Sequence, residues 1–261
     1  MFSHAPVMIN ESIDSLVLNK SGAYLDCTFG LGGHSKEILK RLNSKGTLNS
    51  IDQDQTVIEY AKKIQDPRFK FEYSKFSKIG ELFINRKFDG ILFDLGVSSV
   101  HLDSAERGFS FNKNATLDMR FDRTEGKKVS HYVNELPERE IEHILRSYGQ
   151  EKFSKRIAKN IEKHRINNPI NNTLELVSII NKSVIVNDKN KHNATRSFQA
   201  LRIFVNKELE VLKDVLEKSY NILAPKGRLV LITYHSLEEN VINDFIAVSY
   251  THLTLPTNRE V

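Results

Sequence analysis

Residues 26–34 read Asp-Cys-Thr-Phe-Gly-Leu-Gly-Gly-His, and this stretch decides the fold class. A short apolar run, Ala23–Leu25, precedes it, and an amphipathic run, Ser35–Leu42, follows it. This order predicts a strand, a glycine turn and a helix, an arrangement in which the backbone can come close to a bound nucleotide. Glycine suits such a turn because it lacks a Cβ atom and tolerates positive φ angles. A purely structural turn is the alternative for this stretch taken alone.

The spacing of the glycines separates two classes of nucleotide ligand. A dinucleotide fingerprint has a third glycine where this chain has Ser35, three residues after Gly32. Asp26, followed by Gly30 and Gly32, instead resembles the first motif of S-adenosylmethionine (SAM) methyltransferases, in which an acidic residue precedes glycines. A nicotinamide-dependent oxidoreductase is therefore the disfavoured alternative.

Three more strands are predicted at Thr47–Ile51, Phe69–Tyr73 and Phe88–Phe93. The last is apolar enough for a parallel strand buried on both faces. Asp52 and Asp94 follow the second and fourth strands, at the edge of the sheet where ligands bind in such folds. A carboxylate at Asp52 can accept hydrogen bonds from both ribose hydroxyls of a nucleoside, although a solvated turn aspartate is the alternative.

Longer motifs carry a specific family resemblance. They are Asp94-Leu-Gly-Val-Ser-Ser99, Glu106-Arg-Gly-Phe-Ser-Phe111, Leu117-Asp-Met-Arg-Phe-Asp122, Ala194-Thr-Arg-Ser-Phe-Gln-Ala-Leu-Arg-Ile-Phe-Val-Asn206 and His235-Ser-Leu-Glu238. In this order they resemble the signature of the bacterial 16S ribosomal RNA cytosine-N4 methyltransferases, the RsmH or MraW family. The resemblance covers about residues 4 to 247.

The resemblance implies an α/β fold, a Rossmann-like class I SAM-dependent methyltransferase sheet with an inserted all-helical lobe. The expected layout is a SAM-binding domain in two parts, 1–103 and 201–247, around a helical substrate-recognition lobe at 104–200. Residues 248–261 are interpreted as a non-native tail, because Val248–Thr257 resembles a translated sequencing adapter; a natural divergent C-terminus is the alternative. A chain truncated near Ala247 would leave the fifth strand, predicted at Arg228–Thr233, as an uncovered edge.

The resemblance also implies a set of cofactor-binding residues. Gly32, Gly33 and His34 would meet the methionyl end of SAM, Asp52 the ribose and Phe76 the adenine, with Asp94 and His101 as further contacts. A helix-entry histidine at His34 and a core phenylalanine at Phe76 are the structural alternatives. His101 departs from the family, which usually has glutamine there. An imidazole replaces one amide hydrogen bond but not both polarities at once.

Catalytic residues are harder to assign, because methylation of a cytosine amine mainly requires alignment of the nitrogen with the activated methyl group. Ser98 and His235 are candidates because each follows a predicted strand at the ligand-bearing edge. His235 could accept a proton near neutral pH. A structural role is the alternative for both. No cluster of histidines, cysteines and carboxylates with metal-ligand spacing is visible, so no metal is predicted.

Composition agrees with a cytoplasmic protein. The chain has 261 residues, 39% of them hydrophobic, enough to bury a substantial core. Its single cysteine, Cys27, falls in the predicted first strand and excludes an internal disulfide. No apolar stretch approaches a membrane span of about 18 residues. The net charge of +5 permits a nucleic-acid partner without requiring one.

A basic amphipathic helix is predicted after Gly149. Its cations recur at helical spacing, at Lys152, Lys155, Arg156, Lys159 and Lys163, opposite an apolar stripe of Phe153, Ile157 and Ile161. Such a helix can lay its basic side on RNA phosphates while the other side packs inward. A solvated helix face is the alternative.

Together these features predict SAM-dependent methylation of N4 of a cytidine in 16S ribosomal RNA near the decoding centre. The expected partner is that RNA, within the small ribosomal subunit. A non-catalytic RNA-binding assembly factor that keeps the fold is an alternative of a different class.

Overall fold

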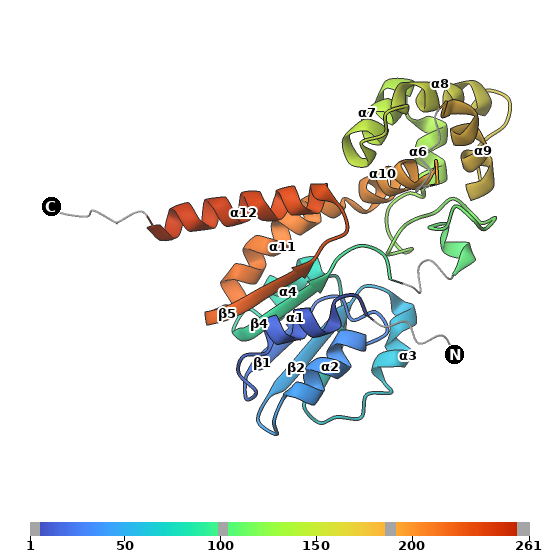
Figure 1. The fold of residues 1–261 in the computed structure, drawn as a ribbon. Coiled ribbons are helices and arrows are strands. Elements are labelled where there is room, and N and C mark those ends of the chain that lie inside the picture. Colours follow the sequence, from blue (N-terminus) through green and yellow to red (C-terminus); the bar gives the residue numbers. More distant parts are fainter. Residues whose placement is uncertain (1–5, 99–103, 186–191, 255–261) are drawn as a thin grey trace. The chain divides into compact units, whose positions relative to one another are not determined.

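The computed structural model describes residues 6–98, 104–185 and 192–254 (Figure 1). The chain divides into two compact units, which are described separately. Unit 1 comprises Met1–Gly96 and Leu209–Val261, and unit 2 comprises Val97–Glu208. The expected helical lobe at 104–200 falls inside unit 2. Helix α10 (Thr195–Asn206) crosses the expected boundary at residue 200.

Unit 1 contains a sheet of five strands that are all parallel to their neighbours. The strands are β1 (Ala23–Asp26), β2 (Thr47–Asp52), β3 (Phe69–Tyr73), β4 (Phe88–Asp94) and β5 (Leu223–Ile232). Their order in the sheet is β3-β2-β1-β4-β5. The first four strands confirm the predicted positions to within a residue. The order reverses between β1 and β4, which is the type of position where open α/β sheets bind ligands.

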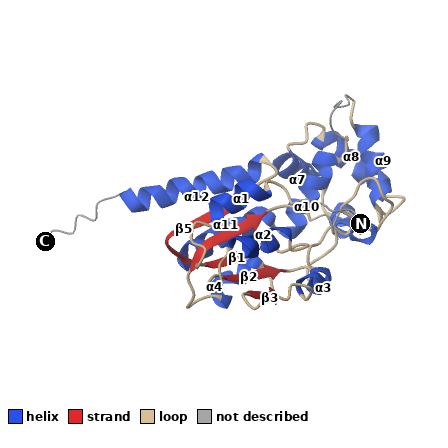
Figure 2. Cartoon of the chain, turned by 60° about the horizontal axis from the view of Figure 1, so that its bottom comes forward, coloured by secondary structure: helices blue, strands red, loops and turns tan. Residues whose placement is uncertain are grey.

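Helices cover both faces of this sheet (Figure 2). They are α1 (Ile9–Leu16), α2 (Gly33–Arg41), α3 (Ile58–Ala61), α4 (Ile79–Leu82), α11 (Glu208–Ile222) and α12 (Ser236–Thr254). Tyr24 and Leu92 pack with α1 and α2 on one face. Leu25 and Ile91 pack with α4, α11 and α12 on the other. Successive strand residues point to opposite faces, so apolar runs such as β4 are explained by burial on both sides.

Strand β5 differs from its prediction. It begins at Leu223, five residues before the predicted Arg228, and its register against β4 is interrupted between Phe88 and Gly90. The interruption contains Pro225, which cannot donate to a sheet ladder, and Lys226, whose φ is 64°. Among the described residues, β5 pairs only with β4 and is therefore an edge strand, while the truncation near Ala247 stays a prediction.

Two further expectations for unit 1 meet different outcomes. Cys27 lies one residue beyond the end of β1, not within it, although its side chain is buried. Helix α12 continues to Thr254, beyond the point at which the expected tail begins. The non-native origin of residues 248–261 stays a prediction. None of the helices in the described part of the chain is both long and apolar enough to cross a membrane.

A buried hydrogen-bond network joins β1, α2 and β2. The Ser35 hydroxyl donates to Asp26 Oδ2 at 2.5 Å and lies 2.8 Å from the Ser50 hydroxyl. Asp26 Oδ1 accepts the Thr28 N–H at 3.1 Å. Asp26, Ser35 and Ser50 are each 0% exposed, and this burial raises the pKa of the Asp26 carboxyl. The serine at the position of the missing third glycine is therefore part of the fold.

Unit 2 is helical in most of its described residues. Its helices are α6 (Val129–Glu135), α7 (Glu138–Gly149), α8 (Ser154–Arg165), α9 (Thr173–Ser183) and α10, with a short 3-10 helix at Ala105–Arg107. They enclose one apolar core that includes Val133, Leu145, Ile157, Ile180 and Leu201. The predicted apolar stripe of α8 is confirmed, because Ile157 and Ile161 are both 0% exposed.

Two helices of unit 2 have residues at their boundaries that favour helix ends. Pro137 directly precedes α7, and Gly149 is its last residue. The residue with a left-handed conformation at the end of α7 is Gln150. Gly149 has a different role, because its lack of a Cβ atom allows the backbone of Arg196 in α10 to approach closely. Asn172 caps α9 with a complete capping box, in which its side chain accepts the Glu175 N–H at 2.9 Å.

Removing this cap should destabilise unit 2. Asn172→Ala leaves the Glu175 N–H without its partner, so the free energy of unfolding should fall by about 1 kcal/mol. Urea denaturation followed by helix circular dichroism measures the loss. Asn171→Ala is the matched control, since among the described residues the Asn171 side chain makes only a 3.5 Å contact, to the Pro169 carbonyl. An equal loss in both variants would contradict the capping role.

The buried Asp26 should make stability depend on pH with a definite sign. Its raised pKa means that the folded chain binds a proton more readily than the unfolded chain, whose carboxyl keeps an ordinary pKa of 3.8. The resulting contribution is complete below 3.8 and is lost as pH rises through the folded-state pKa. Asp26→Asn cannot ionise, so its melting temperature should fall less than that of the wild type between about pH 4 and pH 7. Parallel pH profiles of the two proteins would contradict this assignment.

Candidate functional site

Three carboxylates stand at the carboxyl ends of neighbouring strands in unit 1. Asp26 ends β1, Asp52 ends β2 and Asp94 ends β4. The strands are parallel and in register, with Asp26 opposite Ser50 and Leu92, and Asp94 opposite Ile232. The predicted strand ends therefore gather at one edge, beside the reversal in strand order.

The glycines between β1 and α2 serve different purposes. Gly30 and Gly32 have φ angles of 53° and 76°, which disfavour other residues. A Cβ at Gly32 would lie 2.7 Å from the Phe29 ring, and a Cβ at Gly33 would collide with Pro6. A Cβ at Gly30 would meet no heavy atom closer than 4.0 Å. Packing accounts for Gly32 and Gly33, whereas Gly30 borders open space that a ligand could fill.

Asp52 fixes this turn as well as facing it. Its Oδ2 accepts the Gly30 N–H at 2.8 Å, and its Oδ1 accepts the Asp54 N–H at 2.9 Å. These two backbone bonds hold the side chain in one orientation.

Asp94 is the centre of a second group of contacts. Its N–H donates to Thr28 Oγ1 at 2.7 Å, and its Oδ1 accepts the Tyr234 hydroxyl at 2.9 Å. Burial is the largest cause of a raised pKa at Asp94, and the nearby charge of Glu238 adds to it, while Tyr234 and His34 oppose it. The pKa of Tyr234 is also raised, by burial and then by Asp94. The tyrosine therefore remains a hydrogen-bond donor at physiological pH.

His34 is the second residue of α2 and is 5% exposed. Its Nε2 lies 3.2 Å from the Val7 carbonyl, which can only accept, so Nε2 carries the proton. Its Nδ1 lies 3.8 Å from Asp94 Oδ2. The imidazole thus connects the start of α2 with the end of β4, and its contact with a cofactor stays a prediction.

Phe76 begins a short 3-10 helix (Phe76–Lys78) after β3. Its ring meets Phe93 edge to face, with centroids 5.9 Å apart and planes at 88°. The side chain is half-buried against the core of unit 1. Phe76 is therefore in part a core residue, which was the structural alternative for this position. The rest of its surface is accessible, and the adenine contact stays a prediction.

His235 directly precedes α12 and makes the contacts of a helix cap. The Glu238 N–H donates to His235 Nδ1 at 3.3 Å, and His235 Nε2 lies 3.2 Å from Glu238 Oε1. Glu238 Oε2 in turn accepts the Tyr234 N–H at 2.9 Å. These contacts give His235 a structural role at the start of the helix, and its catalytic role stays a prediction.

The remaining two predicted site residues, Ser98 and His101, lie outside the described part of unit 1. Ser98 is partly buried and belongs to unit 2, where it is the second residue. His101 lies outside the described residues. Tyr234 and Thr28 contact Asp94 but were not predicted from the sequence. For Tyr234 the available signal was its position, between β5 and the His235 motif at the ligand-bearing edge.

Comparison with known proteins identifies the family. Solved structures that this chain resembles include NSun6 from Pyrococcus horikoshii with SFG, a SAM analogue, at 13% identity and a TM-score of 0.45, over 93% of this chain and 41% of that one. A candidate rRNA methylase from Clostridium thermocellum is similar at 16% identity and a TM-score of 0.31, over 34% of this chain and 50% of that one. The chain thus spans half or less of the length of these two structures. The model of the MraW methylase family matches residues 1–261, and the chain belongs to that family.

Proposed function

We propose that this protein transfers the methyl group of SAM to the N4 amine of a cytidine in 16S ribosomal RNA near the decoding centre. Membership of a methylase family supports methyl transfer. The observation that carries the cofactor assignment is the open space at Gly30 beside a fixed Asp52 carboxylate. The proposed substrate belongs to the small ribosomal subunit, which places the reaction in the cytoplasm.

The residues at this edge fit the parts of SAM. Asp52 would accept hydrogen bonds from the ribose hydroxyls, and the accessible part of Phe76 would contact the adenine. Gly32, Gly33 and His34 would border the methionyl end, with Asp94 and His101 as further contacts. Asp52 is already oriented by a hydrogen bond from the backbone and Asp94 by one from a tyrosine hydroxyl, so little ordering of these side chains is needed on binding.

SAM supplies a methyl group that is already activated, and the chain's own residues must align the amine with it. The cytosine amine is a weak nucleophile because its lone pair is delocalised into the ring. Hydrogen bonds that draw the amine out of conjugation, and an acceptor for its proton, would assist. We assign these tasks to Ser98 and His235. His235 Nδ1 accepts the Glu238 N–H, so proton transfer to this atom requires that hydrogen bond to open.

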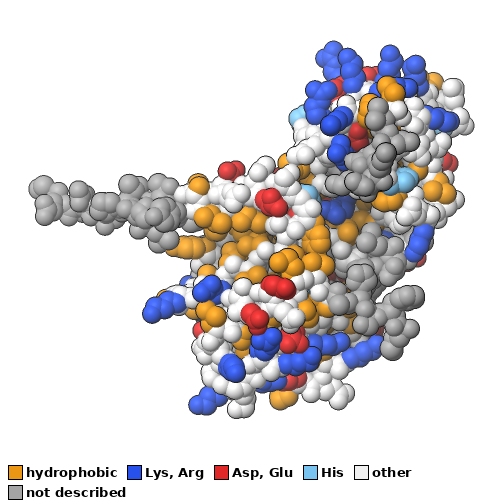
Figure 3. All heavy atoms as spheres, viewed as in Figure 1, with side chains coloured by type: hydrophobic (Ala, Val, Ile, Leu, Met, Phe, Trp, Pro, Cys, Tyr) orange, Lys and Arg blue, Asp and Glu red, His pale blue; other side chains and the backbone are white. Residues whose placement is uncertain are grey.

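The basic side of α8 supports an RNA substrate. Lys155, Arg156 and Lys159 are exposed, and none of them forms an ion pair with another described residue. Figure 3 shows Lys and Arg side chains gathered over the α7 and α8 region of unit 2. Unpaired cations beside one another are favourable where they neutralise phosphates and release counterions. This side of α8 is therefore the proposed contact with the RNA backbone.

The proposed reaction is tested with radiolabelled SAM, using naked 16S ribosomal RNA and intact small subunits as separate substrates. We expect label in N4-methylcytidine after digestion, at one position mapped by mass spectrometry. Label in another base would refute the assigned chemistry. RNA binding without any methyl transfer by the folded protein would favour the assembly-factor alternative.

Asp52→Ala should weaken SAM binding by about 1–3 kcal/mol, equivalent to a Kd raised about 5- to 150-fold, because ribose hydroxyls would lose a charged partner. Calorimetry with SAM measures the change. Asp14→Ala is the control, since it removes an equal charge from an exposed position of α1. Thermal melting checks that the turn held by Asp52 remains folded. Unaltered affinity in folded Asp52→Ala would exclude the ribose role.

Replacing Lys155, Arg156 and Lys159 by Gln should lower RNA affinity and make it less dependent on salt. Each lost phosphate contact should reduce the slope of log affinity against log salt by about 0.7–0.9. Replacing the exposed Lys20, Lys45 and Lys70 of unit 1 by Gln is the charge-matched control. SAM affinity should stay constant in both triple variants. Equal slopes in the two would show that α8 presents only solvated charge.

A further inference from the structure

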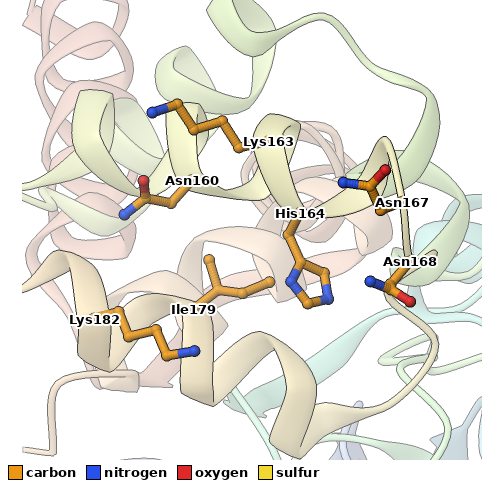
Figure 4. Close-up of a pocket in the computed structure, with 7 residues that line it drawn as sticks. All are labelled: Asn160, Lys163, His164, Asn167, Asn168, Ile179 and Lys182. Carbon is orange, nitrogen blue, oxygen red and sulfur yellow. The ribbon is translucent and has the colours of Figure 1, made fainter.

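A pocket lies between α8 and α9, wholly inside unit 2 (Figure 4). Its volume is about 470 Å³, within the range of small-ligand sites. Six polar side chains line it: Asn160, Lys163, His164, Asn167, Asn168 and Lys182. Ile179, which is 4% exposed, supplies the apolar part of the lining.

The walls of the pocket are held by hydrogen bonds between and within the helices. Asn160 Nδ2 on α8 donates to Ser183 Oγ on α9 at 2.8 Å. The Ser183 hydroxyl donates to the Ile179 carbonyl at 2.7 Å. After α8, the N–H groups of Asn167 and Asn168 donate to the His164 carbonyl at 3.2 and 3.0 Å. The lining residues therefore come from backbone that is fixed before any ligand binds.

The pocket carries positive charge without a compensating carboxylate in its lining. Lys163 and Lys182 come from different helices, and neither forms an ion pair with any residue that the structure describes. The nearby acidic residues are engaged elsewhere, because Glu162 pairs with Arg165 at 3.6 Å and Glu175 belongs to the α9 capping box. Figure 4 shows the His164 and Lys182 side chains pointing toward one another. An anion is the ligand that this charge favours.

The amides add hydrogen-bonding groups of both polarities. Because Asn160 uses its amide nitrogen on Ser183, its oxygen is left to accept from a ligand. Asn167 and Asn168 make no side-chain hydrogen bond within the described residues, and both are exposed. Two cations and several amides together match a phosphate linked to a group with its own donors and acceptors. A phosphodiester with its ribose and base is such a ligand.

We propose that this pocket binds one nucleotide of the RNA substrate. Its phosphate would lie beside Lys182, with the ribose or base edge against Asn160, Asn167 and Asn168. The Lys163 side chain, which points away from Lys182 in Figure 4, adds positive charge to the same pocket. Lys163 follows Lys159 by one helical turn, so the pocket continues the basic side of α8 that is proposed to contact RNA. This continuity favours RNA over an unattached nucleotide. The inference rests on the proposed function in RNA modification.

Charge changes in the pocket test this proposal in the full-length chain. Fluorescence anisotropy with a single-stranded RNA that spans the methylated position should show about 5- to 10-fold weaker binding for Lys163→Gln/Lys182→Gln, with a slope against log salt reduced by about one. Lys163→Arg/Lys182→Arg should retain most of the affinity. Lys128→Gln/Arg139→Gln removes two exposed cations of the same unit outside the pocket and is the control. Equal affinities for the Gln double variant and the control would overturn the proposal.

A second substitution tests the pocket with little change in side-chain volume. Asn168→Asp places a negative charge in the lining and should weaken RNA binding by repelling the phosphate. Asn114→Asp makes the same change at an exposed position of unit 2 that does not line the pocket, and it should leave RNA affinity unaltered. Helix circular dichroism verifies that both variants are folded. An equal response of the two variants would overturn the proposal.

Nuclear magnetic resonance separates RNA from a free anion. The side-chain amide signals of Asn167 and Asn168 should shift with a trinucleotide RNA at lower concentration than with inorganic phosphate. Equal affinity for the two probes would show an anion site only and overturn the proposal.

Kinetics of methyl transfer give a further test. The Gln double variant should have a higher KM for RNA and an unaltered kcat. Absence of methyl transfer in the wild type refutes the proposed function, whereas normal transfer with unaltered KM in the variant refutes only the pocket.

Discussion

The candidate site depends on one buried hydrogen bond, from the Ser35 hydroxyl to the Asp26 carboxylate. It fixes the first turn of α2 to the end of β1, and Ser50 extends the connection to β2. A glycine at position 35, as in a dinucleotide fingerprint, would bring the helix close but leave a buried carboxylate without this partner. The residue that argues against a dinucleotide is thus the residue on which the geometry of the glycine turn depends.

The other two carboxylates at this edge are also oriented by contacts within unit 1. Asp52 holds Gly30 and Asp54 through backbone N–H groups, and Asp94 is held by Tyr234 and lies near His34. Side chains that are already oriented lose little entropy when a ligand arrives, which favours binding. The hydrogen bonds that orient these side chains also stabilise the fold of unit 1. Substitutions there are therefore expected to affect stability together with affinity, so a fold measurement must accompany each binding measurement.

Sequence reasoning succeeded where the signal is local. The apolar strands buried on both faces and the apolar stripe of α8 each depend on a few neighbouring residues. It failed where a partner lies far along the chain. The Tyr234 hydroxyl meets Asp94 across 140 residues, and β5 begins earlier than predicted because Leu223 pairs with the distant Phe88. His235 was predicted as a catalytic candidate because it follows a strand at the ligand-bearing edge. Its contacts to Glu238 became visible only once the start of α12 was placed.

The exposed lysines of α8 and the pocket between α8 and α9 would contribute differently to RNA recognition. Exposed lysines along the helix attract phosphates, which are alike in every sequence, so they give affinity and position without identifying a base. A pocket that adds amide groups to the cations can also contact a sugar or a base edge, and the 2′-hydroxyl distinguishes RNA from DNA. The cations of α8 alone would therefore bind many nucleic acids about equally. Selection of one RNA register requires groups with fixed direction, and the pocket offers one in the Asn160 amide, which its hydrogen bond to Ser183 orients.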